Sequence, residues 1–342
     1  GYNRPAFLQP TDERFQEIAE LYYKEMNRLF GKADYYSMDP FHEGGKVAGV
    51  DLDAAGQAIW KAMKKNNPNA TWVIQAWGAN PRPQMIKNIP KGDLIVLDLY
   101  SESRPQWGDP ESTWYRKNGF DGHQWLYCML LNYGGNVGLH GKMQHVIDEY
   151  YKAAESPFGN SLKGVGITME GTENNPVMYE LLCELPWRPA RFSKDEWLKG
   201  YVSARYGKFS PRLWEAWVLL GNSIYNCPAR STQQGTHESV FCARPSLKVY
   251  QVSSWSEMSD YYNPLEVIRA ASMFVEEADR FKGNNNFEYD LIDVVRQAVA
   301  EKGRLIYKVV RAAYEARDPK LLKQASDRFL ELLLAQDRLL AP

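Results

Sequence analysis

Two glutamates of this 342-residue chain each come just after a strand-like apolar run. Glu43 follows residues 35–39, and Glu170 follows residues 164–169. In an α/β barrel, catalytic side chains lie at the carboxyl ends of the strands, on the loops of one face. Two carboxylates there are the minimum equipment for glycoside hydrolysis, in which one is the acid/base and the other the nucleophile or base. The pair therefore predicts a carbohydrate-cleaving enzyme.

Neighbouring residues leave other interpretations of both positions open. Asp39, at the end of the first run, is a second candidate for the acid/base, and Glu173 is a second candidate for the role of Glu170. Glu43 also fits a surface loop beside two glycines, and Glu170 also fits a solvated turn.

Side chains that follow other strand-like runs are candidates for holding a sugar. Trp77 directly follows such a run, where its indole could stack on a sugar ring, although core packing explains it equally well. Asn132 and Asn136 could bond sugar hydroxyls, or could stabilise turns in a glycine-rich segment. The chain contains 11 Trp and 21 Tyr, a composition that fits a sugar enzyme.

Charge and spacing argue against several other classes of protein. A formal net charge of −1 gives no argument for nucleic acid or an anionic membrane as the partner, and no apolar stretch approaches the ~20 residues that span a bilayer. His140 and His145 do not have the spacing of a metal pair on one helix, and residues 134–138 lack the ending of a phosphate-binding loop. The sequence therefore implies no metal and no cofactor.

The four cysteines contain no CxxC pair, which argues against a zinc ribbon or a redox motif. Cys128 and Cys183 lie in apolar segments and are expected to be buried thiols. Cys227 and Cys242 flank a polar loop and could close a disulfide.

The first half of the chain alternates apolar strand signals with helix signals, which indicates a parallel sheet covered on both faces. Polar or aromatic residues recur directly after the strands, and this pattern favours the rim of a (β/α)8 barrel over an open doubly wound sheet. The strands are expected at residues 35–39, 71–77, 94–100, 125–131 and 164–169, with helices near 11–30, 53–65, 83–88 and 141–154.

Strand signals end near residue 188, and the remainder of the chain shows only helical periodicity. We therefore expect two domains: residues 1–188 as part of a (β/α)8 catalytic barrel, and residues 189–342 as an all-α domain. The helices of the second domain are expected near residues 194–205, 210–222, 262–281, 287–316 and 318–340.

The order of motifs along the chain resembles the family 89 glycoside hydrolases, the α-N-acetylglucosaminidases. No single motif is decisive, but their succession covers the chain from about Phe7 to its end. They include Asp39-Pro40-Phe41-His42-Glu43, Gln75-Ala76-Trp77, Leu97-Asp98-Leu99-Tyr100, Leu130-Leu131-Asn132-Tyr133-Gly134-Gly135-Asn136, Gly166 with Glu170-Gly171, Ala204-Arg205-Tyr206-Gly207 and Tyr225-Asn226-Cys227.

The resemblance implies the C-terminal part of a TIM-like barrel followed by a helical domain. It also implies a retaining exo-glycosidase that removes terminal α-linked N-acetylglucosamine through a covalent glycosyl-enzyme. Glu43 matches the family's acid/base position, Glu170 its nucleophile and Trp77 a tryptophan that lines the sugar pocket. His42 departs from the pattern, because a family member has asparagine there; either side chain is expected to serve as a polar neighbour.

Family members are longer at both ends, so we expect the all-α domain to be incomplete at its C-terminus. The expected partners are a glycan with terminal α-linked N-acetylglucosamine and further N- and C-terminal segments of the same enzyme. Family members occur in lysosomes and among secreted, periplasmic or cell-surface bacterial enzymes. Two other functions stay open: an α-glycosidase of different sugar specificity, and a carbohydrate-binding protein without catalysis.

Overall fold

The computed structural model describes residues 8–43, 45–132, 138–170, 175–229, 239–249, 252 and 261–341. The chain divides into two compact units. The sheet unit comprises Gly1–Met129 and Lys152–Thr168, and the helical unit comprises Leu130–Tyr151 and Met169–Pro342. The units divide the chain differently from the two domains expected from sequence, whose boundary stays a prediction.

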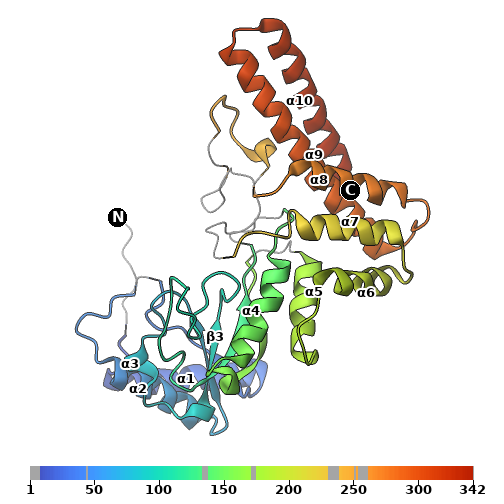
Figure 1. Ribbon diagram of the computed structural model, residues 1–342. Helices are drawn as coiled ribbons and strands as arrows, with labels where there is room; N and C mark the ends of the chain where they lie inside the picture. Colours follow the sequence, from blue (N-terminus) through green and yellow to red (C-terminus); the bar gives the residue numbers. More distant parts are fainter. Residues whose placement is uncertain are drawn as a thin grey trace. The chain divides into compact units, whose positions relative to one another are not determined.

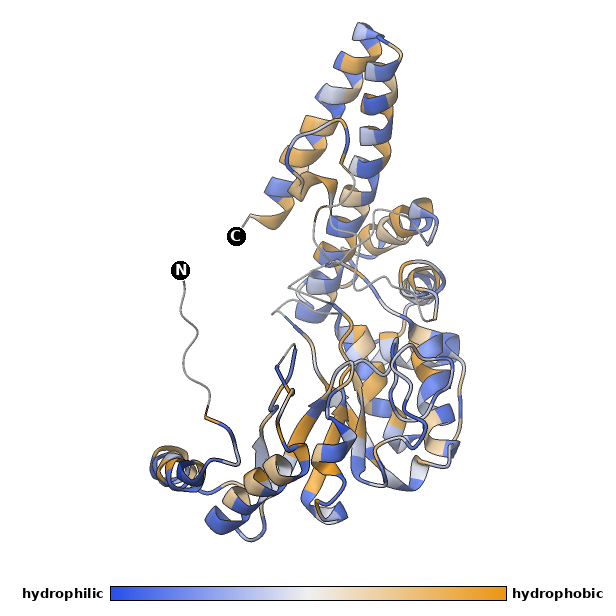
Figure 2. Cartoon of the chain, turned by 90° about the vertical axis from the view of Figure 1, so that its left-hand side faces the viewer, coloured by the Kyte–Doolittle hydropathy of each residue, from blue (hydrophilic) through white to orange (hydrophobic). Residues whose placement is uncertain are grey.

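The sheet unit is built on five parallel strands in the order β1-β2-β3-β4-β5, which is also their order along the chain. Five parallel strands with intervening helices, followed by a run of helices, fit the expected part of an α/β barrel and its helical domain. The strands appear mostly orange, and so apolar, in Figure 2. They are β1 (Tyr35–Ser37), β2 (Thr71–Ala76), β3 (Leu94–Asp98), β4 (Gln124–Met129) and β5 (Leu162–Ile167).

Alternating burial along β2 explains why this segment is a strand. Trp72, Ile74 and Ala76 are all fully buried, while the residues between them are half-buried. The side chains of a strand point alternately to its two faces, so both faces of this central strand are covered to different degrees. The expected strand at residues 71–77 is therefore confirmed, with Trp77 just beyond its end.

Helices of the sheet unit begin at the capping residues that the sequence offers. The side chain of Asp12 accepts a hydrogen bond from the N–H of Arg14, and that of Asp51 accepts one from Ala54. The elements are α1 (Glu13–Phe30), α2 (Leu52–Asn66), α3 (Pro83–Ile86), and the short 3-10 helices Lys91–Asp93 and Gly159–Ser161; α4 (Met143–Glu155) runs across the division between the units.

The described part of the helical unit is helical throughout, apart from loops and one isolated bridge between Lys142 and Asn226. Its longest elements, α9 and α10, form the antiparallel hairpin at the top of Figure 1. The helices are α5 (Pro176–Glu184), α6 (Lys194–Tyr206), α7 (Pro211–Asn222), α8 (Pro264–Glu276), α9 (Asn285–Glu315) and α10 (Pro319–Leu340), with 3-10 helices Leu185–Trp187 and Val240–Cys242.

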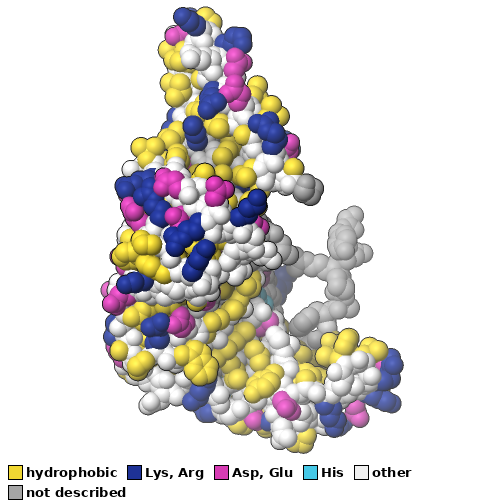
Figure 3. Space-filling view, turned by 90° about the vertical axis from the view of Figure 1, so that its right-hand side faces the viewer, with side chains coloured by type: hydrophobic (Ala, Val, Ile, Leu, Met, Phe, Trp, Pro, Cys, Tyr) yellow, Lys and Arg dark blue, Asp and Glu magenta, His cyan; other side chains and the backbone are white. Residues whose placement is uncertain are grey.

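Exposed apolar residues on the α9–α10 hairpin are interspersed with charges of both signs, as the upper part of Figure 3 shows. They include Val309, Tyr314, Leu321, Leu330 and Leu334. Among the described helices, none is both long and apolar enough to cross a membrane.

Helix α5 is absent from the sequence-based expectation, and the prediction for Cys183 is wrong. Val177, Met178, Leu181 and Leu182 are all buried, so this short helix lacks the one-sided stripe that reveals a surface helix. Cys183 is nevertheless exposed, because its position next to the inward-facing leucines puts it on the other side of α5. Cys128, on β4, is buried as expected.

Candidate active site

A strained turn after β1 presents Glu43 to solvent. Phe41 and Glu43 both have positive φ values, 61° and 41°, which residues other than glycine rarely adopt. Phe41 is buried, whereas Glu43 is exposed. A Cβ on Gly45 would lie 2.4 Å from the Cα of Phe41. The backbone at position 45 can therefore approach that of Phe41 this closely only because residue 45 is glycine. Such strain concentrates at functional sites.

Asp39 lies at the start of this turn, and its carboxyl group accepts a hydrogen bond from the neighbouring strand. The Oδ1 of Asp39 accepts the backbone N–H of Gln75 on β2 at 2.6 Å. Burial raises the pKa of the Asp39 carboxyl, although this hydrogen bond and the nearby His42 oppose the rise. The expected strand at 35–39 accordingly ends at Ser37, where the side chain of Asp39 replaces backbone pairing.

His42 lies between Asp39 and Glu43 in the chain, and it is half-buried. Its Nε2 is buried without a hydrogen-bond partner among the described residues. Buried polar atoms in native proteins are almost always paired, so such an atom is suited to form a hydrogen bond with a ligand or water.

Trp77 follows β2, the neighbour of β1, in a turn closed by two backbone hydrogen bonds between Trp77 and Asn80. Its half-buried ring lies 4.6 Å from that of Trp114, with an interplanar angle of 70°, and 6.2 Å from that of Tyr100. Because β1 and β2 are parallel neighbours, Glu43, His42 and Trp77 follow the same edge of the sheet.

Asp98, the last residue of β3, is fully buried, and burial raises the pKa of its carboxyl to about 7. Its Oδ2 accepts the N–H of Gln106 at 2.9 Å, so it fixes the loop that follows β3. Sequence reasoning assigned no role to Asp98 or to Trp114. A polar residue closing the apolar run 94–98, followed by a loop containing tryptophans, was the available signal.

Glu170 is exposed and lies two residues beyond Thr168, the last residue of the sheet unit. Thr168 is held firmly: its N–H donates to the carbonyl of Met129, and its hydroxyl donates to the carbonyl of Leu99. In the helical unit, Asn175 is buried and accepts hydrogen bonds from the N–H of His140 and the hydroxyl of Tyr225. Glu170 therefore stands in a segment that follows a well-anchored strand end.

Asn132 follows β4 and belongs to the helical unit. It is fully buried, and neither its Oδ1 nor its Nδ2 has a hydrogen-bond partner among the described residues. An unpaired buried amide is costly, which makes it a candidate for contact with a polar ligand. Asn136 and Glu173, the alternatives considered above, lie outside the described residues.

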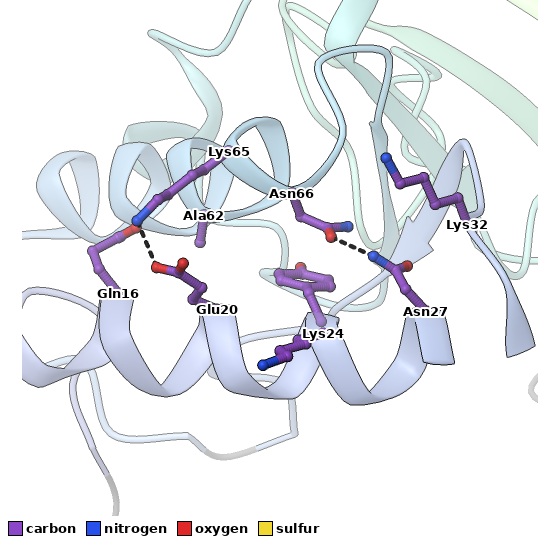
Figure 4. A pocket seen from close by; sticks show the side chains of 9 residues that line it. Gln16, Glu20, Lys24, Asn27, Lys32, Ala62, Lys65 and Asn66 are labelled. Atoms are coloured by element: carbon purple, nitrogen blue, oxygen red, sulfur yellow. Dashed lines mark hydrogen bonds and ion pairs between the residues drawn. The ribbon is translucent and has the colours of Figure 1, made fainter. Parts of the chain in front are cut away.

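A cavity of about 350 Å³ lies between α1 and α2, and it is not a second candidate for catalysis. Figure 4 shows Glu20 pointing toward Lys65, with which it forms an ion pair at 2.6 Å. It also shows the hydrogen bond that the side chain of Asn27 donates to that of Asn66. Glu20 is the one carboxylate among the residues described as lining this cavity, so the pair needed for glycoside hydrolysis is missing there.

No group of three His, Cys, Asp or Glu side chains in the described parts of the chain has the arrangement of a metal site.

Comparison with known proteins gives matches along nearly the whole chain. Residues 1–189 match the family model of the α-N-acetylglucosaminidase TIM-barrel domain, and residues 197–342 match that of the C-terminal domain. Human α-N-acetylglucosaminidase is 32% identical over 359 residues; the match covers 100% of this chain and 46% of the human protein. The chain thus spans about half the length of this relative.

Solved structures of a family 89 glycoside hydrolase from Clostridium perfringens superimpose with a TM-score of 0.85 and 31% identity, over 96% of this chain and 36% of theirs. One is a complex with 2-acetamido-1,2-dideoxynojirimycin and another with PUGNAc. A third, of a form with two glutamates changed to glutamine, is in complex with its substrate GlcNAc-α-1,4-galactose, at the same TM-score and identity.

Proposed function

The chain belongs to the α-N-acetylglucosaminidase family, glycoside hydrolase family 89, and we propose that it carries the catalytic carboxylates of an enzyme that hydrolyses terminal α-linked N-acetylglucosamine. The observation that carries the proposal is the placement of Glu43: an exposed carboxylate on a strained turn directly after β1. The disaccharide bound by the Clostridium relative, GlcNAc-α-1,4-galactose, is the first natural substrate to test.

In the retaining mechanism that we propose, the α-linkage requires a nucleophile from the protein. In an α-linked N-acetylglucosaminide, the leaving oxygen is cis to the acetamido group on C2. That group cannot reach the back face of C1, so it cannot displace the leaving group itself. A retaining hydrolysis therefore needs a carboxylate of the enzyme to attack C1.

Glu170 is the proposed nucleophile and Glu43 the proposed acid/base. An oxygen of ionised Glu170 forms a bond to C1 while the bond from C1 to the leaving oxygen breaks, and protonated Glu43 donates its proton to that oxygen. In the second step, Glu43 takes a proton from water, whose oxygen attacks C1 and releases Glu170. Two inversions give net retention, for which the carboxyl groups must stand ~5–5.5 Å apart.

The sugar is proposed to be held by Trp77, His42 and Asn132. Trp77 supplies a half-exposed aromatic face, while His42 and Asn132 supply buried polar atoms that lack partners among the described residues. Hydroxyl and acetamide groups of the sugar would complete these hydrogen bonds, which is the usual way that a concave site fixes orientation.

The test is hydrolysis of an aryl α-N-acetylglucosaminide by the full gene product, with the first-formed anomer followed by NMR. We expect release of the α-anomer by the wild type and no measurable turnover by Glu170→Ala. Glu43→Ala should lose about 10²–10⁴-fold in kcat/KM, the usual contribution of a general acid/base. Azide should rescue both variants, giving the β-azide with Glu170→Ala and the α-azide with Glu43→Ala.

Glu173→Ala and Asp39→Asn are the matched controls, because these carboxylates are the sequence alternatives for the two roles. Each should retain most of the activity. Initial release of the β-anomer would mean inversion and would remove Glu170 from its role. Turnover of a different aryl α-glycoside, with none of this one, would discard the sugar specificity.

A further inference from the structure

A long loop after β3 carries a second aromatic platform beside Trp77. Residues 99–123 connect β3 to β4 and, in the described structure, contain neither helix nor strand. Connections in α/β units are usually ~2–6 residues long, and longer irregular ones are commonly functional. The loop leaves the sheet at the carboxyl end of β3, the edge where Glu43 and Trp77 also follow their strands.

Three polar contacts fix this loop in place. Asp98 accepts the N–H of Gln106, the side-chain oxygen of Gln106 accepts Nε–H of Arg116 at 2.6 Å, and Nη1 of Arg116 donates to the carbonyl of Pro81 at 2.8 Å. Pro81 belongs to the segment that follows Trp77. The chain of contacts therefore ties the loop after β3 to the turn after β2.

The result is a fixed cluster of rings that contains Trp114, Trp77 and Tyr100. Trp114 meets Trp77 edge to face at 4.6 Å and lies 6.5 Å from the buried ring of Tyr100. The guanidinium of Arg104 lies over Trp114, 5.2 Å from the ring centre. Trp114 and Arg104 are both half-buried, so each keeps surface for a ligand.

Within the described ranges, the N–H donors of the Arg104 guanidinium remain available to a ligand. Among the described residues, the structure shows no hydrogen bond or ion pair to its guanidinium, only the contact with Trp114. An aromatic face next to free N–H donors matches a hexose, which has an apolar C–H face and a rim of hydroxyls.

We propose that Trp114 and Arg104 form the binding site for the leaving-group sugar, the residue to which the terminal N-acetylglucosamine is linked. This inference rests on the proposed function, in which Trp77 contacts the terminal sugar. A ring that meets Trp77 edge to face is placed to contact the next sugar along the chain. The ligand is a neutral hexose, such as the galactose of GlcNAc-α-1,4-galactose.

The test compares two substrates that differ only in the leaving group. GlcNAc-α-1,4-galactose fills the proposed site, whereas α-N-acetylglucosaminyl fluoride leaves it empty. In Trp114→Ala, the ratio of kcat/KM for the disaccharide to kcat/KM for the fluoride should fall about tenfold or more, as expected for loss of a stacking contact. Arg104→Ala should lower the same ratio by a smaller factor, and Trp114→Phe should recover part of the loss.

Tyr115→Ala is the control, because Tyr115 is the exposed neighbour of Trp114 on the same loop, and its ratio should equal that of the wild type. If Trp114→Ala does not fold, Trp114→Phe and Arg104→Ala still report the ratio. Wild-type cleavage of both substrates with an unchanged ratio in the Trp114 and Arg104 variants would overturn this inference alone. Failure of the wild type to cleave either substrate would overturn the proposed function.

Discussion

The side chain of Asp39 continues the β1–β2 ladder after the backbone of β1 has left it. In an unbroken parallel ladder, the N–H of Gln75 would donate to the carbonyl of Met38. That carbonyl instead accepts the indole N–H of Trp72 at 2.8 Å, and Gln75 donates to Oδ1 of Asp39 at 2.6 Å. The exchange lets the chain turn away toward Glu43 without leaving a backbone donor of β2 unpaired.

This relationship predicts different effects for two substitutions at Asp39. Asp39→Ala leaves the N–H of Gln75 without its acceptor and should lower the free energy of unfolding by about 1–3 kcal/mol. Asp39→Asn keeps an oxygen in the same place and should cost less than half as much. Urea unfolding of the full gene product measures both. Equal losses in the two variants would show that the charge, rather than the acceptor, matters.

Asp98 predicts a dependence of stability on pH. Its pKa is raised from 3.8 to about 7 in the folded protein. Between these values the folded state holds a proton that the unfolded chain has released, so the free energy of unfolding falls as the pH rises. The contribution of Asp98 is fully present below the unfolded value and is lost as the pH passes the folded value.

Asp98→Asn isolates this contribution, because the amide keeps an acceptor for Gln106 and cannot ionise. From pH 5 to pH 8, wild type should lose about 3 kcal/mol relative to the variant. His123, whose pKa burial lowers to about 4, has the opposite slope between that value and 6.5, but it is common to both proteins and cancels. Parallel pH profiles of unfolding would refute the prediction.

Gly166 on β5 predicts a packing conflict. A Cβ at this position would lie 2.5 Å from Sγ of the buried Cys128 on the neighbouring strand. Gly166→Ala should therefore lower the free energy of unfolding by about 1–3 kcal/mol. Combining it with Cys128→Ala should recover at least half of that loss in a double-mutant cycle. Gly200→Ala in α6, where a Cβ meets open space, is the control and should stabilise slightly.

Asp290 predicts a large effect in the helical unit. It is buried on α9 and accepts hydrogen bonds from Nη2 of Arg205 at 2.7 Å and from the hydroxyl of Tyr206 at 2.8 Å. Asp290→Ala leaves the guanidinium of Arg205 without its ion-pair partner and should lower the free energy of unfolding by about 3–5 kcal/mol. Asp327→Ala breaks an exposed ion pair with Lys323 on α10 and should cost less than about 0.5 kcal/mol. Similar melting temperatures for the two variants would contradict this ranking.

The sequence predicted the elements whose patterns are local. The apolar run at residues 71–77 marked a strand, and the long apolar stripe containing Val294 marked α9. The same reasoning found Glu43, Trp77 and Glu170, because each directly follows a strand-like run. Their catalytic and binding roles stay predictions until tested.

Features that depend on contacts between distant residues were not visible in the sequence. In the sequence, Asp98 is only the last residue of an apolar run. Its role depends on the fold, which brings the N–H of Gln106 to its carboxylate. Trp114 lies in a segment without periodicity, and its packing on Trp77 joins two different loops. Side-chain hydrogen bonds such as that of Asp39 likewise depend on strand register, which the sequence pattern alone does not set.

The agreement between strand order in the sheet and strand order in the chain has a consequence for synthesis. Each strand from β2 to β5 pairs with the strand translated just before it, and none has to insert between two earlier strands. A nascent chain leaving the ribosome can therefore add one β–α unit at a time to a growing edge, N-terminal units first. The strands can therefore pair in the order in which they are synthesised. At each stage, the edge of the sheet that the next strand joins is the strand that was translated last.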